Sequence, residues 1–242
     1  MLAGERPDGD PLAQAFGVSA KALIPVGGQA MGARVVETLA AHPAIGRVRV
    51  LGDPAKLATL GGVVVEPSGR SIAATMRGLL GAGAGRVLVT TADHPLIDAA
   101  MLDAFTTGAG DADLAIGMVE RETLLAAYPG SRRTWLRFRG GAYSGANLFM
   151  VGGVQIRPLL DVWARVEQER KRGRAIVGAF GPLLLAGVAL RLLSLRGALS
   201  RVGGRHGLSV VPVVLPQAEA CIDVDSVADH NLVEMILNSR HT

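Results

Sequence analysis

Cysteine is almost missing from this chain of 242 residues, because Cys221 is the only one. A single cysteine excludes an intrachain disulfide and a cysteine metal cluster, and it is typical of a reducing compartment, so we expect a cytoplasmic protein. Aromatic residues make up only 4% of the chain, while apolar residues make up 49%. A core of Val, Leu, Ile and Ala is typical of parallel sheets covered by helices.

Apolar runs long enough to cross a membrane are also lacking. The first twenty residues carry Glu5, Asp8 and Asp10, which argues against a secretory signal. One uncharged run, 175–190, is shorter than the ~20 residues that a spanning helix needs, and glycines and a proline interrupt it. We therefore expect no transmembrane segment and interpret this run as buried or interface helices, with contact at a membrane surface as the weaker alternative.

Lysine is scarce too, since only three of the 25 basic residues are lysines in a chain of formal net charge +4. The arginines are scattered, and the densest basic run is 169–174. We interpret that run as a solvated helix end rather than a nucleic-acid patch, and we expect no nucleic-acid partner. A modest positive field would also assist the approach of anionic substrates.

Apolar runs typical of strands alternate with runs of helical spacing along the chain. We predict strands over 47–51, 63–65, 86–91, 113–119, 147–151, 208–215 and 220–224. We predict helices over 71–80, 98–105, 158–170 and 226–237, with Asp98 and Ser226 as N-caps. This alternation favours a three-layer α/β/α fold with a mostly parallel central sheet. We expect one domain over 1–242, with a helical insertion at about 155–207.

Polar residues that follow strands are the candidates for chemistry, because ligands of such sheets bind at the carboxyl ends of the strands. The first candidate is a glycine loop that begins at Leu2-Ala3-Gly4 and leads to Lys21. Backbone N–H groups of such a loop can surround a triphosphate, and a lysine adds a mobile positive charge. The alternative is an exposed lysine beside an ordinary turn.

Carboxylates follow two further apolar runs. Asp93 comes after the predicted strand 86–91, and Asp98 is better placed to cap the next helix, so we interpret Asp93 as a metal ligand. Asp223 and Asp225 alternate with apolar residues at the predicted strand 220–224, so both should point to one face, where like charges need a cation. Mg²⁺ prefers such oxygen ligands together with substrate phosphates. The alternative for Asp225 is a cap on the last helix.

Small residues, one tyrosine and one amide occupy the segment 140–147, which includes Ser144, Gly145 and Asn147. Small residues let a ligand approach the backbone closely, and an asparagine amide can bind a base edge or a hydroxyl. For this segment by itself, a hairpin turn is the favoured alternative.

Taken in order, these segments resemble the MobA-like nucleotidyltransferase superfamily, which has a GT-A type α/β fold. The resemblance rests on Leu2-Ala3-Gly4, Lys21-Ala22-Leu23-Ile24-Pro25, Asp93-His94-Pro95, Ser144-Gly145-Ala146-Asn147, and Ile222-Asp223-Val224-Asp225 through Asp229. It implies Mg²⁺-dependent transfer of a nucleoside monophosphate from an NTP to a phosphorylated or acidic small molecule, with release of pyrophosphate. GTP is one candidate donor, and molybdopterin, a sugar phosphate, a cobinamide phosphate and a lipid-precursor phosphate are candidate acceptors.

The resemblance also implies roles at the matching positions. The nucleotide would be bound by Leu2, Ala3, Gly4, Glu5, Lys21, Thr91, Ala92 and Asp93, with Lys21 and Asp93 taking part in catalysis. Mg²⁺ would be held by Asp93, Asp223 and Asp225. The acceptor would be bound by Pro95, Ser144, Gly145 and Asn147. A homo-oligomer is a further expectation.

Two departures from the family pattern bear on activity. The loop carries Glu5, Arg6, Pro7 and Asp8 where the family has glycines, a serine and Arg-Met-Gly, which affects base selectivity. A buried strand normally precedes the first motif, whereas this chain begins at Met1, so we expect marginal stability or activity. Two alternatives stay open: a GT-A type glycosyltransferase that uses a nucleotide-sugar, and a nucleotide-binding protein that has lost turnover.

Overall fold

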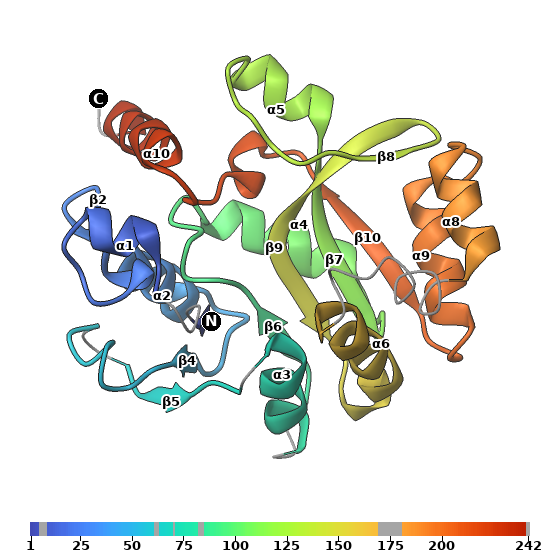
Figure 1. The fold of residues 1–242 in the computed structure, drawn as a ribbon, viewed down its shortest axis with the longest axis horizontal. Coiled ribbons are helices and arrows are strands. Elements are labelled where there is room, and N and C mark those ends of the chain that lie inside the picture. The colour runs from blue at the N-terminus through green and yellow to red at the C-terminus, as the bar shows by residue number, and fades with distance from the viewer. Residues whose placement is uncertain (5–8, 61–62, 70, 82–84, 169–180, 241–242) are drawn as a thin grey trace. The chain divides into compact units, whose positions relative to one another are not determined.

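The structure is a computed structural model that describes residues 1–4, 9–60, 63–69, 71–81, 85–168 and 181–240 (Figure 1). The densest basic run, 169–174, lies outside the described residues, as does Glu5. The chain forms two compact units that alternate along the sequence. Unit 1 consists of Met1–Ser68, Val89–Asp103 and Glu219–Thr242, and unit 2 consists of Gly69–Leu88 and Ala104–Ala218.

Unit 1 is built on short parallel strands. β1 (Leu2–Ala3) pairs with β4 (Val50–Gly52), and β4 pairs with β5 (Val65–Pro67). On its other side, β1 forms a parallel bridge to Thr91, and the Leu2 N–H donates to the carbonyl of Thr90 at 2.7 Å. β1 therefore lies between β4 and the segment that leads to Asp93.

Unit 1 also contains helices and a small hairpin. These are α1 (Pro11–Ala15), the 3-10 turn η1 (Lys21–Leu23), β2 (Pro25–Val26), β3 (Gln29–Ala30), α2 (Met31–Ala41) and α10 (Val227–Arg240). α2 buries Met31, Val35, Val36 and Leu39, whose spacing places them on one helix face. The Met31 N–H donates to the carbonyl of Ile24 at 2.8 Å, so the buried helix also fixes the chain that follows η1.

Unit 2 contains a mixed sheet in the order β10-β7-β9-β6 (Figure 1). β7 (Leu114–Glu120) pairs parallel with β10 (Val210–Leu215) and antiparallel with β9 (Gly141–Val151). β8 (Leu136–Phe138) forms a hairpin with β9, and β6 (Val87–Val89) follows β9 in the sheet. The helices that belong wholly or partly to this unit are α3 (Ile72–Gly81), α4 (Ala99–Ala109), α5 (Arg121–Ala127), α6 (Arg157–Gln168), α8 (Pro182–Ala189) and α9 (Leu195–Gly204).

β9 is distorted opposite Gly117. Ile116 pairs with Phe149 and Met118 with Gly145, so residues 146–148 stand opposite Gly117 alone. A Cβ at position 117 would lie 3.0 Å from the Cβ of Leu148, which explains the glycine. At this bulge Asn147 takes a φ of 50°, a left-handed conformation that asparagine tolerates better than most residues.

The predicted α/β class is confirmed, and most predicted elements are present with shifted ends. The helix predicted over 71–80 is α3, and Asp98 caps α4 by accepting from the Met101 N–H at 2.9 Å. The strand predicted over 220–224 is wrong, because Ala218–Cys221 form the 3-10 turn η3 and the residues after it join no sheet. That run is apolar because it is buried, not because it pairs with a strand.

In the described part of the chain, no helix combines the length and the apolar character needed to cross a membrane. The first six residues of the uncharged run 175–190 lie outside that part, and α8 occupies eight residues of the remainder. Helices α6, α8 and α9 fall within 155–207. That they form an insertion stays a prediction.

Candidate active site

Lys21 lies between two carboxylates in unit 1. Its Nζ is 2.8 Å from Asp93 Oδ2 and 2.5 Å from Asp225 Oδ1. The side chains of Lys21 and Asp93 are 17% and 21% exposed, whereas that of Asp225 is 66% exposed. The lysine therefore joins a largely sheltered carboxylate to one at the solvent.

Backbone hydrogen bonds bring these distant segments together. The Ala92 N–H donates to the carbonyl of Leu2 at 2.9 Å, which fixes the turn that carries Asp93 against β1. The Val224 N–H donates to the carbonyl of Asp93 at 3.0 Å. Asp225 is thereby placed beside the same turn.

The start of α10 fixes the backbone of Asp225. Ser226 Oγ accepts from the Asp229 N–H at 3.2 Å and donates to the Asp229 carboxylate at 2.7 Å. The same carboxylate accepts from the Asp225 N–H at 3.3 Å. Ser226 is therefore the cap of α10, as predicted, and the Asp225 side chain reaches Lys21 instead of capping the helix.

The charge of Lys21 is stabilised by its neighbours. Burial by itself would lower the pKa of Lys21, but the negative charge of Asp93 and hydrogen bonds to Asp225 and Asp93 outweigh it, so the pKa is raised above its ordinary value. Lys21 is therefore fully charged at neutral pH.

The second oxygen of Asp93, Oδ1, is buried and has no hydrogen-bond partner within the described residues. A buried carboxylate oxygen without a partner is open to a further cationic ligand.

The carboxylates fit a divalent cation such as Mg²⁺. This ion usually takes one or two protein carboxylates, and water and substrate phosphates supply its other ligands. Asp93 and Asp225 already converge on one positive charge, and Asp93 Oδ1 offers a further oxygen. Across the described ranges, no three His, Cys, Asp or Glu side chains are grouped closely enough to form a complete protein cage. A metal ion here would need the substrate to complete its coordination.

Asp223 requires a correction. The expectation that Asp223 and Asp225 share one strand face is wrong, because this segment is not a strand. Asp225 contacts Lys21, whereas Asp223 is half-buried, and its role as a metal ligand stays a prediction.

The backbone predicted to bind the nucleotide belongs to the same unit as Lys21. Leu2 and Ala3 form β1, and Gly4 is exposed at its end. Thr91 forms the bridge to Leu2, and Ala92 is buried directly before Asp93. These predicted residues are therefore neighbours in space, apart from Glu5, which lies outside the described residues.

The residues predicted to bind the acceptor are divided between the units. Pro95 is buried in unit 1, two residues after Asp93. Ser144, Gly145 and Asn147 lie on β9 in unit 2, so the segment 140–147 is mostly a strand, and the hairpin turn lies between Phe138 and Gly141. The role of these four residues toward an acceptor stays a prediction.

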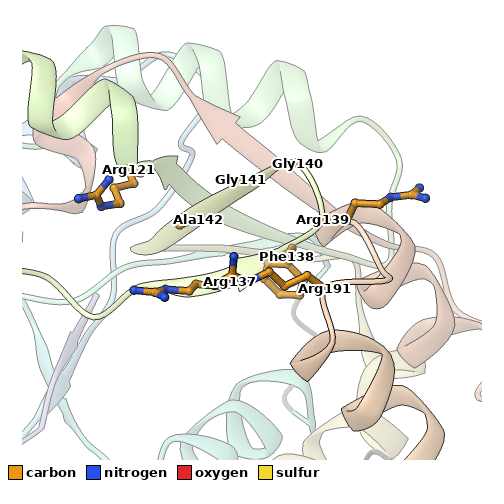
Figure 2. A pocket seen from close by; sticks show the side chains of 8 residues that line it. All are labelled: Arg121, Arg137, Phe138, Arg139, Gly140, Gly141, Ala142 and Arg191. Carbon is orange, nitrogen blue, oxygen red and sulfur yellow. The ribbon is translucent and has the colours of Figure 1, made fainter.

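One pocket of unit 2 is not predicted by the sequence. Its volume is about 610 Å³, and it is lined by Arg121, Arg137, Phe138, Arg139, Gly140, Gly141, Ala142 and Arg191 (Figure 2). The local signal is weak, because only the alternation Arg137-Phe138-Arg139 before two glycines marks it in the sequence. The remaining arginines come from distant segments.

Most of the chain is similar to known proteins. The family model of the MobA-like NTP transferase domain matches residues 12–179. Among curated protein sequences, none matches this chain. The structure of a hypothetical transferase from Thermus thermophilus is similar, with 30% identity, a TM-score of 0.82, and coverage of 95% of this chain and 96% of that one.

Two more distant structures share the fold. A CMP:2-keto-3-deoxy-manno-octonic acid synthetase complexed with CTP has 14% identity and a TM-score of 0.56, covering 91% of this chain and 92% of its own. A 2-C-methyl-D-erythritol 4-phosphate cytidylyltransferase, also from Thermus thermophilus, has 15% identity and a TM-score of 0.54, covering 90% of this chain and 94% of its own. At these identities the likeness is one of fold.

Proposed function

We propose, from the premise that this chain belongs to the MobA-like NTP transferase family, that it transfers a nucleoside monophosphate from an NTP to a phosphorylated or acidic small molecule, releasing pyrophosphate. The observation that supports this most is the convergence of Asp93 and Asp225 on Lys21 beside the exposed end of β1. Such a cluster offers both signs of charge that a metal–triphosphate complex needs.

Each residue of the cluster has a proposed task. Lys21 would hold the triphosphate by its positive charge, and Gly4 would let the phosphates approach the backbone at the end of β1. Asp93 and Asp225, with Asp223 as a further candidate, would hold Mg²⁺, which neutralises phosphate charge when it is bound. Thr91 and Ala92 would form the backbone wall of the nucleotide site.

The transfer itself requires positioning more than proton chemistry. An oxygen of the acceptor forms a new bond to the α-phosphorus, and the bond from that phosphorus to the pyrophosphate oxygen breaks. The electron pair of the broken bond leaves with pyrophosphate. An acceptor phosphate is already ionised at neutral pH and needs no general base, which agrees with a site built from a lysine and carboxylates.

A glycosyltransferase of the same fold is less well supported. Enzymes of that class usually carry Asp-x-Asp after a central strand, and here the sequence is Asp93-His94-Pro95. Pro95 stands where the second carboxylate would be, and it is buried.

Three predictions from the sequence remain proposals: a cytoplasmic location, a single domain and a homo-oligomer.

The first experiment is a thermal shift assay with each of the four NTPs, with and without Mg²⁺. A ligand at about 100 times its Kd stabilises the native state by about 2.7 kcal/mol. For a chain of this size, that corresponds to a rise in Tm of roughly 5–10 °C. We expect a Mg²⁺-dependent rise for one NTP, and its loss in Asp93→Asn.

The control variant is Asp111→Asn, which changes a fully exposed carboxylate of unit 2 that pairs with Arg86. It should keep the full shift. Candidate acceptors are then screened for release of pyrophosphate. Release of a nucleoside diphosphate from a nucleotide-sugar would favour the glycosyltransferase instead, and NTP binding without turnover on any acceptor would favour a binding protein.

A further inference from the structure

The pocket of unit 2 combines a positive charge with an aromatic wall. Its arginines come from three places: Arg121 begins α5, Arg137 and Arg139 flank Phe138 in and after β8, and Arg191 follows α8. Figure 2 shows the side chains of Arg121 and Arg137 extending to the same side, with Arg191 beside Phe138, while Arg139 extends away from them. Arg121, Arg137 and Arg191 therefore line the same pocket as Phe138.

One carboxylate, that of Glu120, lies beside Gly141 in the wall of this pocket. All four arginines are exposed, and none forms an ion pair with a described carboxylate. Other arginines of the chain are paired: Arg77 with Asp161, for example, and Arg86 with Asp111. Like charges around one pocket repel each other, and an anion would remove that repulsion.

Arg191 occupies a backbone position that favours glycine. Its φ is 54°, and it is the residue after the C-cap Leu190 of α8. Its N–H donates to the carbonyl of Val188 at 2.9 Å, and the Leu192 N–H donates to that of Gly187 at 2.8 Å, which together form a Schellman motif. A side chain in this left-handed conformation is strained, so an arginine here is better explained by what its guanidinium does.

A tertiary contact holds Arg191 at the pocket. The Arg139 N–H donates to the carbonyl of Leu193 at 2.8 Å, which ties the β8–β9 hairpin to the connection between α8 and α9. The pocket wall is therefore built by residues that the fold fixes relative to one another. Its volume lies within the roughly 300–1,000 Å³ that is usual for small-molecule sites.

We propose that this pocket binds a small organic phosphate, with the phosphate held by Arg121, Arg137 and Arg191 and the organic part against Phe138. Arginine suits this ligand because its planar fork donates two parallel hydrogen bonds to one phosphate. The site lies wholly in unit 2 and does not depend on the nucleotidyl transfer proposed for unit 1.

The test is calorimetric titration of the full chain with inorganic phosphate and with phenyl phosphate, without Mg²⁺. Phenyl phosphate should bind more tightly, because its ring can contact Phe138. Arg137→Gln should weaken binding by roughly three- to tenfold, the loss expected for one partly exposed charge-assisted contact. Arg196 is also exposed and lies on α9 outside the pocket, so Arg196→Gln should leave binding unchanged.

Arg191→Gly separates a binding role from a structural one. Relief of the left-handed strain should raise the Tm of the free protein by roughly 2–4 °C, while phosphate binding weakens. A lower Tm for this variant with unchanged binding would overturn the proposal. Lys21→Met should retain binding at the pocket, and loss of binding in that variant instead would assign the phosphate to unit 1 and overturn the proposal. Binding of single-stranded DNA or of phosphatidylserine vesicles in place of both phosphates would likewise overturn it.

Discussion

Replacing Lys21 by methionine removes the ammonium group that joins Asp93 to Asp225 and keeps most of the apolar stem. Removing one partner of a buried ion pair costs about 3–5 kcal/mol, whereas an exposed pair contributes at most about 1 kcal/mol. With Lys21 and Asp93 at 17% and 21% exposure, the site lies between these limits. We expect a loss of about 2 kcal/mol, or a fall in Tm of roughly 4–8 °C.

The two carboxylates should contribute unequally to this loss. The contact with Asp225 is shorter, at 2.5 Å against 2.8 Å for Asp93, but Asp225 is 66% exposed and its charge is screened by water. Double-mutant cycles should therefore give a coupling of about 1–2 kcal/mol for Lys21 with Asp93 and below about 0.5 kcal/mol for Lys21 with Asp225.

The pH dependence of the Tm difference between wild type and Lys21→Met provides a second measure of this ion pair. A group whose pKa is raised in the folded state stabilises that state fully below its unfolded pKa and loses this effect as the pH rises through the folded pKa. The pKa of Lys21 is raised, so from neutral pH to a pH of about 9 the difference in Tm between wild type and variant should be constant, and on the alkaline side it should shrink only above the ordinary lysine pKa of about 10.4.

Thermal unfolding followed by circular dichroism measures both the loss of stability and its pH dependence. Mg²⁺ added to the Lys21→Met variant should restore part of the lost Tm, because the freed carboxylates can take up the ion. A variant whose Tm stays within about 1 °C of wild type would refute the reasoning from burial, since an unpaired sheltered carboxylate must be destabilising. A larger coupling to Asp225 than to Asp93 would show that distance outweighs burial at this site.

Three further predictions concern the scaffold. Ser226→Ala removes the cap that accepts from the Asp229 N–H and should lower the free energy of unfolding by about 1 kcal/mol in urea, whereas Ser226→Asp should retain most of it. Gly117→Ala places a Cβ 3.0 Å from a buried leucine at the bulge of β9 and should cost about 1–3 kcal/mol in the same assay; equal stability would contradict the packing argument. The pKa of Asp113 lies below its ordinary value, and the main cause is the hydrogen bond from the Ser209 backbone N–H. The ionised Asp113 therefore stabilises the folded state at neutral pH, and this stabilisation is lost as the pH falls below about 3.9. Asp113→Asn should therefore lower the Tm at pH 7 and have a smaller effect in acid.

Local features of the fold are predictable because their contacts lie within a few residues. Ser226 and Asp229 are three positions apart and bond to each other, and Asp98 accepts from the N–H three residues on. The spacing of apolar residues over 71–80 likewise predicts α3. In each case the interaction partners are next to one another in the chain, so the sequence pattern already contains the physical cause.

Strands and sites depend on partners that lie far away. The run 220–224 has the apolar character of a strand, yet it joins no sheet, since a strand requires a neighbouring strand in register. By contrast, the segment 140–147 becomes a strand because β7 and β8 pair with it.

The candidate site likewise depends partly on features that the sequence shows and partly on contacts that only the tertiary structure makes. The sequence by itself marked Lys21 and Asp93 as candidate site residues and Asp225 as a candidate metal ligand, through residue type and order along the chain. Only the tertiary structure decided that a lysine and carboxylates separated by 72 and 204 positions meet within 2.8 Å. It also decided that Arg121, Arg137 and Arg191, which come from distant segments, line one pocket of unit 2, because this requires long loops of chain to be closed.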